Sequence, residues 1–356
     1  MKKRILLLRL DAIGDFVLFT SMLPHLRNKF QDDHITLILH PDVAPLAEYC
    51  PYVDNIIVID QKQYAVDRNY AEEIVKKVQG QFDVTVNTMY TRTWQSDNII
   101  ARTHAPIKIG FQCVDTDGEQ KRRSNEEILY THLVHTTKEW MFELDRYKQF
   151  LGEISAPVPE QNLKPELWIS DKDKLWAKNY IQANLPSKNK FTILCPGAGF
   201  DTKLWSSQSF ARVVDYLIED QSMHIVIVGS EKDKALASSI MVNTKNKIHD
   251  LTGKITLNQF AALAEQSSLY LGIDTAGFHI AWTLGIPTIG IFGGGHFGRF
   301  TPSLPHVRII HHKMDCYNCY WHCIYDGTKC ITSITPENVI TAIDQLLRKN
   351  NKIVRG

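Results

Sequence analysis

The stretch that decides the fold is LGIDTAGFHIAWTLGIPTIGIFGGG, residues 271–295. It predicts a buried strand, a short polar turn, an apolar helix and a second buried strand, which is the pattern of a parallel sheet covered by helices. The turn and the start of the helix carry Asp274, Thr275 and His279. Free amides at a helix N-terminus attract anions, so this turn predicts a phosphate site that Asp274 braces. A lone histidine on an apolar helix is more often a core residue, but these polar neighbours favour a role in the site.

Short apolar runs alternate with helical patterns along the whole chain, which predicts an α/β protein with parallel sheets. The expected strands are residues 4–9, 35–39, 55–59, 83–87 and 107–110 in the first half, and 191–195, 224–229, 269–273, 288–292 and 307–311 in the second. Between the halves lies the proline-rich segment SAPVPEQNLKPELW, so we place a domain boundary near Lys164. A last helix is expected over 335–350, with Thr335 as its N-cap and Pro336 at its first position.

Length and charge limit the class of protein. The chain has 356 residues, which suits two α/β domains better than one core. Its 40 basic and 39 acidic residues give a net charge of +1, which argues against a dedicated nucleic-acid-binding protein. The apolar run Ile5–Leu8 is too short for a secretory signal, and no stretch has the length of a membrane-spanning helix. We therefore expect a cytoplasmic protein, which still permits peripheral contact with a membrane.

The N-terminal segment RILLLRLDAIGDF, residues 4–16, predicts a strand, a tight turn and a helix. We expect Gly14 to give the turn its conformational freedom and Asp15 to stand where the helix begins, at the carboxyl edge of the sheet. Two interpretations of Asp15 are equally supported by spacing. It either stabilises the helix N-terminus or acts as a general base.

Two loops of the second half can bind the polar parts of a nucleotide. The small-residue loop 196–199, followed by Lys203, suits a diphosphate whose negative charge must be stabilised as it departs. Asp233 follows the strand 224–229, where a carboxylate often holds ribose hydroxyls, although capping of the next helix is the stronger alternative. Thr256 and Gln259 have the spacing of a capping box, which predicts a structural role.

At these residues the chain resembles glycosyltransferase family 9, the ADP-heptose–dependent heptosyltransferases. The matching segments are RLDAIGDFVL, PGAGFDTKLW, GSEKD, LTGKITLNQFAAL and GIDTAGFHIAWTLGIPTIGIFGG, in the order of the family. The resemblance implies a GT-B fold, with two Rossmann-like doubly wound domains facing a cleft. It implies an acceptor-binding domain over residues 1–164 and a nucleotide-sugar-binding domain over 165–334. The final helix, 335–350, is a candidate to pack back on the first domain.

The resemblance also implies a role for individual residues. Asp15 corresponds to the catalytic base, and Lys203 to a contact of the donor phosphates. The implied nucleotide site consists of Gly14, Ala198, Gly199, Asp233 at the ribose, Ile255 against the adenine, Asp274, Thr275, Ala276, Gly277 and His279. The chain departs from the family at Ala276, where most members have glycine, and at Ala198 and Gly199, where many have a hydroxyl residue. These departures bear on the identity of the donor and not on the fold.

Four cysteines, Cys316, Cys319, Cys323 and Cys330, crowd one segment. Four thiolates can enclose a structural zinc or iron ion, and many members of the family carry a comparable segment. Only the first pair has CxxC spacing, however, and reduced thiols that pack a loop remain an open alternative. A second acidic motif, DTD at 115–117, also has the form of a metal site, but it lies in a charged stretch and we reject that role.

The resemblance implies an inverting glycosyltransferase that needs no metal for catalysis and moves a heptose from ADP-heptose to a lipopolysaccharide core acceptor. Basic residues between Arg92 and Arg123, especially Arg102, Lys108, Lys121, Arg122 and Arg123, are candidates to receive an acidic acceptor. The acceptor places the enzyme in the cytoplasm, with peripheral contact to the inner membrane. Two alternatives remain: a protein O-heptosyltransferase of the same family, acting on a protein such as an autotransporter, and a non-catalytic nucleotide- or sugar-binding scaffold.

Overall fold

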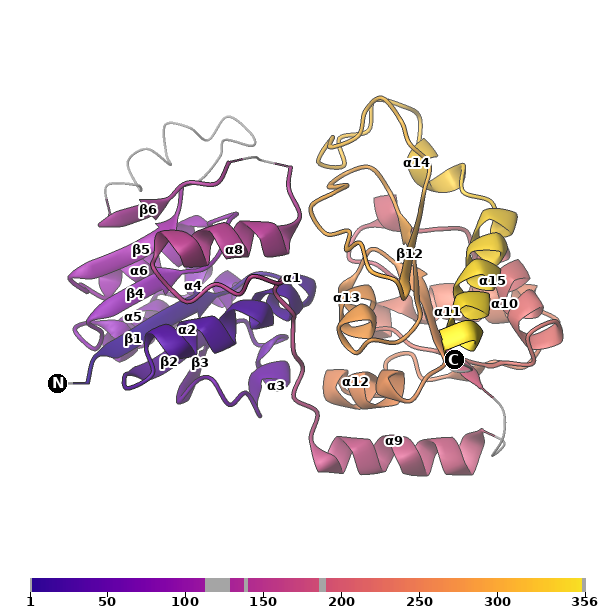
Figure 1. Cartoon of the computed structure of the whole chain (residues 1–356), viewed down its shortest axis with the longest axis horizontal. Helices are drawn as coiled ribbons and strands as arrows, with labels where there is room; N and C mark the ends of the chain where they lie inside the picture. The colour runs from indigo at the N-terminus through magenta and orange to yellow at the C-terminus, as the bar shows by residue number, and fades with distance from the viewer. Residues whose placement is uncertain (1, 113–128, 138–139, 186–189, 354–356) are drawn as a thin grey trace. The chain divides into compact units, whose positions relative to one another are not determined.

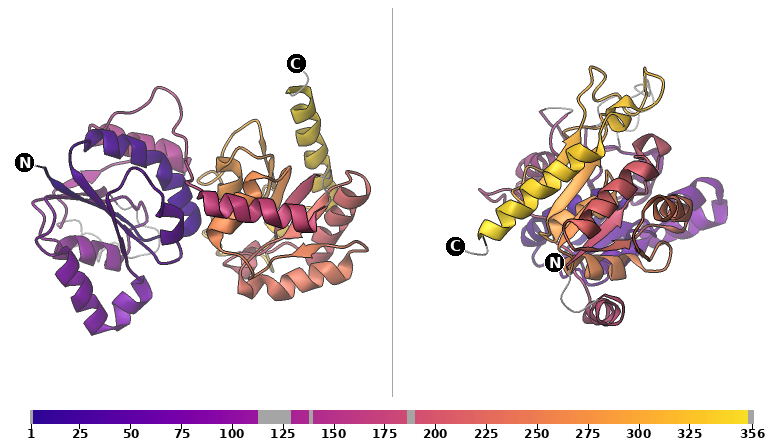
Figure 2. Two further views of the ribbon diagram at one scale, coloured as in Figure 1. Left: turned by 90° about the horizontal axis from the view of Figure 1, so that it is seen from below. Right: turned by 90° about the vertical axis from the view of Figure 1, so that its right-hand side faces the viewer.

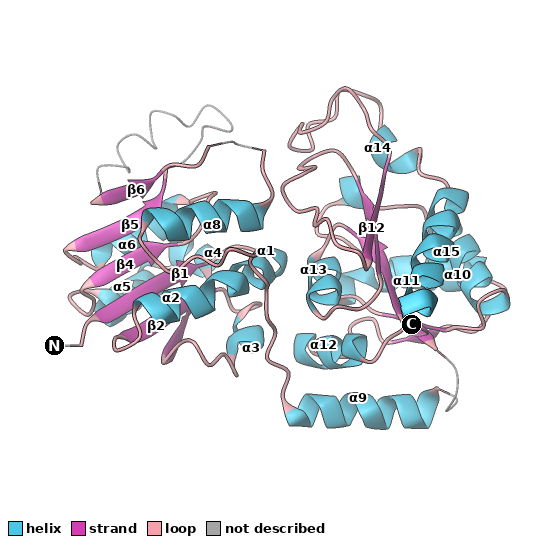
Figure 3. Ribbon diagram, viewed as in Figure 1, coloured by secondary structure: helices cyan, strands magenta, loops and turns pink. Residues whose placement is uncertain are grey.

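The computed structural model describes residues 2–112, 129–137, 140–185 and 190–353 (Figure 1). The chain divides into two compact units, Met1–Trp168 and Ile169–Gly356. Each unit has its own parallel sheet, with helices on both faces of the sheet (Figure 3).

The first unit contains a six-stranded parallel sheet in the order β3-β2-β1-β4-β5-β6. Its strands are β1 (Arg4–Arg9), β2 (His34–Leu39), β3 (Asn55–Val58), β4 (Val84–Asn87), β5 (Ile107–Phe111) and β6 (His132–Val134). Its helical segments are α1 (Ile13–Phe19), η1 (Thr20–Met22), α2 (Leu23–Lys29), α3 (Ala44–Ala47), α4 (Gln61–Val66), α5 (Arg68–Val78), α6 (Trp94–Arg102) and α8 (Glu143–Glu153). This order is that of a doubly wound fold, and its direction reverses between β1 and β4.

The strands of this sheet lack an alternating pattern because both faces are covered. Ile5 to Arg9 of β1 are all buried. Leu6 and Leu8 belong to a cluster that includes Ile74 of α5 and Ile99 of α6. Alternate residues of a strand point to opposite faces, so Ile5 and Leu7 are buried on the other face of the sheet.

The second unit repeats this architecture, with the strand order β12-β11-β10-β7-β8-β9. Its strands are β7 (Phe191–Cys195), β8 (His224–Ile227), β9 (His249–Asp250), β10 (Leu269–Ile273), β11 (Thr288–Phe292) and β12 (Val307–His311). Its helical segments are α9 (Asp171–Asn184), η2 (Asp201–Lys203), α10 (Ser207–Glu219), η3 (Glu231–Asp233), α11 (Lys234–Asn243), α12 (Leu257–Glu265), α13 (Ala276–Thr283), α14 (Lys329–Thr332) and α15 (Pro336–Ile353). Here the order reverses between β7 and β10.

The final helix packs within the second unit. Val339 and Ile343 of α15 are fully buried in one cluster with Phe210 of α10 and Ile291 of β11. Figure 2 shows α15, in yellow, running beside the salmon α10. The helix begins at Pro336 as predicted, and the hydroxyl of Thr335 accepts a hydrogen bond from the Asn338 amide at 3.3 Å. The apolar face of α15 therefore completes the core of the second unit.

The ten predicted strands are all present, and their ends differ from the prediction by at most two residues. The prediction missed β6 and β9, which have 3 and 2 residues. Both lie at an edge of their sheets, where one neighbouring strand determines the pairing. Such short pairs carry too little sequence pattern to be recognised.

The proline-rich segment after α8 packs on the first unit. The amide of Glu166 donates to the Thr20 hydroxyl at 2.8 Å, and its carboxylate accepts from the Tyr52 hydroxyl at 2.9 Å. The division between the units falls after Trp168, whose ring lies edge-on to Tyr52. Within the described ranges, no helix is both long and apolar enough to cross a membrane.

Candidate active site

The candidate site residues gather at the two positions where strand order reverses. In a doubly wound sheet the loops on the two sides of such a position diverge, and ligands bind beyond the carboxyl ends of the strands there. In the first unit, β1 is followed by Asp11 and Asp15. In the second unit, β7 is followed by the loop 196–199 and Lys203, and β10 is followed by Asp274.

A buried cation lies between the ends of β1 and β4, where the strand order of the first sheet reverses. Arg9, the last residue of β1, is 1% exposed, and its Nη1 donates to the carbonyl oxygen of Thr88 at 2.6 Å. Its Nε lies 2.7 Å from Asp11 Oδ1, and its guanidinium lies 5.5 Å from the ring centre of Tyr147. Burial alone would lower the pKa of Arg9, but the nearby carboxylates raise it above its usual value. Arg9 is therefore a fixed positive charge, which the sequence analysis did not select.

Asp15 lies beside this charge, in the first turn of α1. Its Oδ1 is 3.9 Å from Arg9 Nη2, and its backbone carbonyl accepts from the same nitrogen at 3.2 Å. Its side chain is 22% exposed, so solvent reaches it. Gly14 is the second residue of the helix, so the expectation that it forms the turn is wrong. A first-turn carboxylate that is both solvent-accessible and near a cation suits helix stabilisation and general-base chemistry alike.

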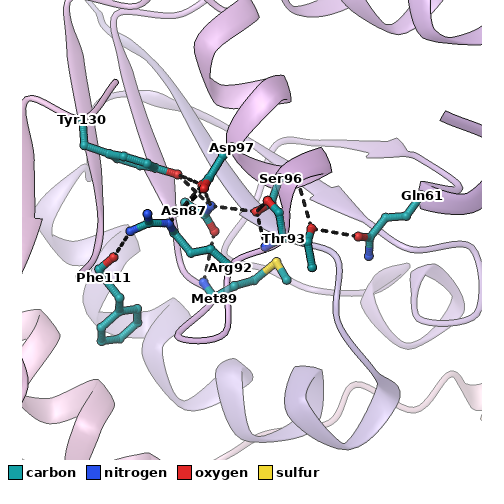
Figure 4. Close-up of polar contacts among 9 residues, drawn as sticks. All are labelled: Gln61, Asn87, Met89, Arg92, Thr93, Ser96, Asp97, Phe111 and Tyr130. Carbon is teal, nitrogen blue, oxygen red and sulfur yellow. Dashed lines mark hydrogen bonds and ion pairs between the residues drawn. The ribbon is translucent and has the colours of Figure 1, made fainter. Parts of the chain in front are cut away.

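A buried polar network stabilises the chain between the end of β4 and the start of α6 (Figure 4). Asn87, at the end of β4, donates to the Tyr130 hydroxyl at 2.9 Å, and that hydroxyl donates to Asp97 Oδ1 at 2.6 Å. Arg92 Nε lies 3.0 Å from Asp97 Oδ1, and Arg92 Nη1 donates to the carbonyl of Phe111. Burial raises the pKa of Tyr130 well above its usual value, so its proton stays in the network.

This network fixes the chain just ahead of Asp11. Thr93, the N-cap of α6, donates its hydroxyl to Gln61 Oε1 at 3.2 Å, and Gln61 in turn donates to the carbonyl of Leu10. Arg92 was grouped with the basic candidates for an acidic acceptor, but it is 4% exposed and braces this edge instead. The candidates Lys121, Arg122 and Arg123, and the rejected DTD motif, lie outside the described residues.

A second cation spans the β7–β10 position in the other unit. Lys203 Nζ lies 2.6 Å from Asp274 Oδ2 and 3.3 Å from the Asp274 carbonyl oxygen. The two side chains are 16% and 11% exposed, so the pair is mostly withdrawn from water but still accessible. The structure thus brings together two residues that are far apart in sequence and that were predicted for one phosphate site.

Two other predicted nucleotide-site residues, Asp233 and Ile255, lie in the same unit. The carboxylate of Asp233 accepts from the amide and the hydroxyl of Ser230 at 2.7 and 2.8 Å, so it caps the η3 turn. A Cβ placed on Gly197 would lie 2.0 Å from Asp233 Oδ1, which sets Asp233 directly against the loop that holds Ala198 and Gly199. Ile255 is half-buried just before α12, whose capping box between Thr256 and Gln259 is present as predicted.

The N-terminus of α13 is set closely on the sheet. Thr275 is the N-cap, and Ala276 and Gly277 are the first two helical residues. A Cβ on Gly277 would lie 2.7 Å from the Tyr270 hydroxyl and 3.1 Å from Cys195 Sγ. The missing side chain of Gly277 therefore lets the helix start near β10.

His279 lies behind this helix start, in an aromatic environment. It is 4% exposed, and its Nδ1 accepts from Trp282 Nε1 at 3.2 Å. The ring also packs edge-on to Phe278 and Phe300. Burial lowers the pKa of His279 to about 4, so the ring is neutral near pH 7. These contacts match the core interpretation of this histidine, and its predicted contact with ADP remains a prediction.

The cysteine cluster has no metal-binding geometry in this structure. Cys330 is buried, Cys316 and Cys319 are partly buried, and Cys323 is exposed. Among the described residues, which include all four of these cysteines, no three His, Cys, Asp or Glu side chains are placed to hold one metal ion. Cys330 Sγ instead accepts from the Gly294 amide at 3.4 Å. The residues as they stand do not fit the expected zinc or iron ion.

Comparison with known proteins places this fold among the GT-B glycosyltransferases. The model of glycosyltransferase family 9 (heptosyltransferase) matches residues 73–326. The chain belongs to glycosyltransferase family 9, as its motifs predicted. The matched range contains Lys203, Asp274 and His279 but begins after Asp15.

Relatives of similar length support this assignment. Lipopolysaccharide heptosyltransferase 3 of Escherichia coli K12 is 22% identical, over 94% of this chain and 95% of that protein. A glycosyl transferase family 9 structure from Veillonella parvula superposes with a TM-score of 0.82 at 21% identity, over 98% of both chains. The ADP-heptose lps heptosyltransferase II of E. coli gives a TM-score of 0.73 at 19% identity, over 99% of this chain and all of that one. The predicted GT-B fold class is thereby confirmed.

The buried network predicts a large loss of stability on replacement of its carboxylate. Asp97→Asn removes the partner of a cation that is 1% exposed, so we expect the free energy of unfolding to fall by about 3–5 kcal/mol. Urea unfolding followed by circular dichroism measures the change. The matched control is Glu73→Gln, which breaks the exposed pair between Glu73 and Lys77 and should cost less than about 0.5 kcal/mol. Equal losses in the two variants would contradict the role given to the network.

The lowered pKa of His279 predicts a loss of stability in mild acid. Its pKa is lowered from 6.5 to about 4, so below pH 6.5 the unfolded chain binds a proton that the folded chain does not bind. The free energy of unfolding therefore falls as the pH drops, with about 1–2 kcal/mol from this residue between pH 7 and pH 5. His279→Gln, which can still accept from Trp282, should remove that part. An unchanged pH dependence in His279→Gln would disprove the prediction.

Proposed function

We propose that this chain transfers a heptose from ADP-heptose to a lipopolysaccharide core acceptor, with inversion at the anomeric carbon. The observation that carries the proposal is the Lys203–Asp274 pair, which holds an ammonium group beside the N-terminus of α13 at the β7–β10 position. An ammonium group beside free helix amides suits a diphosphate. Membership of family 9 and the named lipopolysaccharide heptosyltransferase relatives support the sugar and the acceptor.

The proposed reaction is a single displacement. The acceptor hydroxyl oxygen attacks the anomeric carbon, its proton passes to the carboxylate of Asp15, and the bond between the anomeric carbon and the phosphate oxygen breaks. ADP leaves with one more negative charge than it carried in the donor. Lys203 and the amides at Thr275–Gly277 stabilise that charge as it develops. The scheme uses side chains and amides of this chain for every step, and no step passes through the cysteine segment.

Each predicted domain has one part in this proposal. Residues 1–164 would bind the acceptor and supply Asp15, and residues 165–334 would bind the nucleotide with Ala198, Gly199, Asp233, Ile255 and the α13 turn. A lipopolysaccharide core intermediate carries a lipid, so we propose action as a peripheral protein at the cytoplasmic face of the inner membrane. A protein acceptor is the alternative, and offering both acceptors with the same donor separates the two.

The identity of the nucleotide is tested by ligand-induced stabilisation. Saturating ADP or ADP-heptose should raise the melting temperature, because a ligand that binds the folded state stabilises it by mass action. At 100 times its Kd, the effect is about 2.7 kcal/mol. GDP and UDP at the same concentrations serve as controls and should give much smaller shifts. A larger response to GDP or UDP would overturn the assignment of the donor.

Replacement of the proposed base should separate binding from transfer. Asp15→Asn keeps the shape of the side chain but cannot take a proton, so we expect the rate of transfer to fall at least about 100-fold with little change in ADP affinity. A coupled assay of ADP release measures the rate. The control is Asp145→Asn, an exposed acidic residue in the first turn of α8, which should retain full activity. Wild-type turnover in Asp15→Asn would remove this mechanism.

A further inference from the structure

The cysteine-rich segment, residues 316–330, has no part in the proposed reaction. It is nevertheless hydrogen-bonded to the loop that follows β11. The amide of Asn318 donates to the Gly294 carbonyl at 2.7 Å, and the amide of Tyr320 donates to the Gly295 carbonyl at 3.0 Å. This loop extends from the carboxyl end of β11, which is the neighbour of β10 in the sheet. The segment is thus attached to the same edge of the sheet as Lys203 and Asp274.

The backbone of this segment is held in an unfavourable conformation. Asn318, Tyr320 and Trp321 have φ angles of 65°, 50° and 66°. This left-handed region is common for glycine and asparagine but rare for bulky side chains, and each such residue costs about 1–3 kcal/mol. Strain of this kind persists only where surrounding contacts fix it, and it concentrates at functional sites.

The conformation places the indole of Trp321 flat against the glycines after β11. A Cβ on Gly295 would lie 2.3 Å from Trp321 Cε2, and a Cβ on Gly293 would lie 2.7 Å from Trp321 Cη2. Gly294 leaves the same kind of space for Tyr317, at 2.3 Å. The three consecutive glycines therefore admit these two rings, and any side chain there would displace them.

The Trp321 ring in turn contacts the cation of the donor site. Lys203 Nζ lies 5.2 Å from the centre of the ring, within the range of a cation–π interaction. The indole Nε1 is buried and has no acceptor among the described residues, so the ring is not held by a hydrogen bond of its own. The attraction between the Lys203 ammonium and the Trp321 ring is therefore a specific contact that favours this strained position of Trp321.

A neutral histidine completes the surroundings of this contact. The His296 ring lies 5.3 Å from Tyr320 and 6.5 Å from Trp321, centre to centre. Burial, with help from the charges of Arg299 and Lys203, lowers the pKa of His296 to about 4. Near pH 7 the ring therefore adds no positive charge that would repel the ammonium of Lys203.

We propose that Trp321 is a positioning residue for Lys203, and that the cysteine-rich segment serves to hold its indole against the lysine of the donor-diphosphate site. The inference rests on the proposed function, because it takes Lys203 to bind the diphosphate of ADP. Trp321 attracts the ammonium without neutralising it. The charge of Lys203 is kept at the β7–β10 position while its remaining N–H group stays available to phosphate.

A double-mutant cycle on ADP binding tests this inference. The variants are Trp321→Leu, Trp321→Phe, Lys203→Met and the pair Trp321→Leu with Lys203→Met, measured by isothermal titration of the full-length chain with ADP. Loss of a cation–π contact should weaken ADP binding about 2- to 30-fold in Trp321→Leu, and Trp321→Phe should recover most of that affinity. In the Lys203→Met background, Trp321→Leu should have almost no further effect. Ile324→Ala, a change of a 74% exposed residue in the same segment, is the control and should bind ADP normally.

The outcomes distinguish this inference from the proposed function. If wild-type protein does not bind ADP, both are overturned. If Lys203→Met weakens ADP binding but Trp321→Leu does not, only the inference is overturned. The inference alone is also overturned if Trp321→Leu weakens ADP binding equally in the wild-type and Lys203→Met backgrounds, because that result indicates a packing role for Trp321. Failure of Trp321→Phe to recover affinity, with its fold intact by circular dichroism, would also contradict the inference.

Discussion

Both units depend on one constraint: a parallel sheet covered on both faces buries its strands, so the charged side chains of the candidate site lie at its carboxyl edge. At that edge each unit has one cation across the position where strand order reverses: Arg9 in the first and Lys203 in the second. A charge withdrawn from water is costly unless an opposite charge accompanies it. The carboxylates of Asp11 and Asp15 therefore gather around Arg9, and that of Asp274 meets Lys203. The positions of these three carboxylates therefore follow from the positions of the two cations that they balance.

Sequence alone predicted the buried strands, because continuous apolar runs between turns are typical of covered parallel strands. It also assigned Lys203 and Asp274 to the same phosphate site, where the structure pairs them. It missed Arg9 because a basic residue at a strand end has no pattern of its own. It placed Gly14 in a turn, but Gly14 lies inside α1, because the exact limits of a helix depend on neighbours that are distant in sequence. The sequence did not indicate a role for Trp321. The cysteines around it predicted a metal site, and the pattern of Gly293–Gly295 does not show that these glycines admit its ring.

The geometry around Arg9 distinguishes the two carboxylates after β1. Asp11 lies 2.7 Å from the guanidinium, whereas Asp15 lies 3.9 Å from it. Asp11 is therefore the nearer counter-ion of the buried arginine, and Asp15 is oriented by the same cation at a longer distance. In the proposed mechanism Asp15 is the base, which leaves Asp11 the separate task of balancing the buried arginine.

The surroundings of Lys203 suit a charge that grows during a reaction. A lysine ammonium has three N–H donors, and Asp274 offers acceptors to two of them, its carboxylate at 2.6 Å and its carbonyl at 3.3 Å. The Trp321 ring attracts the same ammonium but accepts no conventional hydrogen bond, so one donor stays available to a phosphate oxygen. Only interactions that strengthen in the transition state accelerate a reaction. In the proposed reaction, a lysine fixed by one carboxylate and one aromatic ring would meet that condition, because its attraction for the diphosphate would increase as the bond to the sugar breaks and the charge on ADP rises.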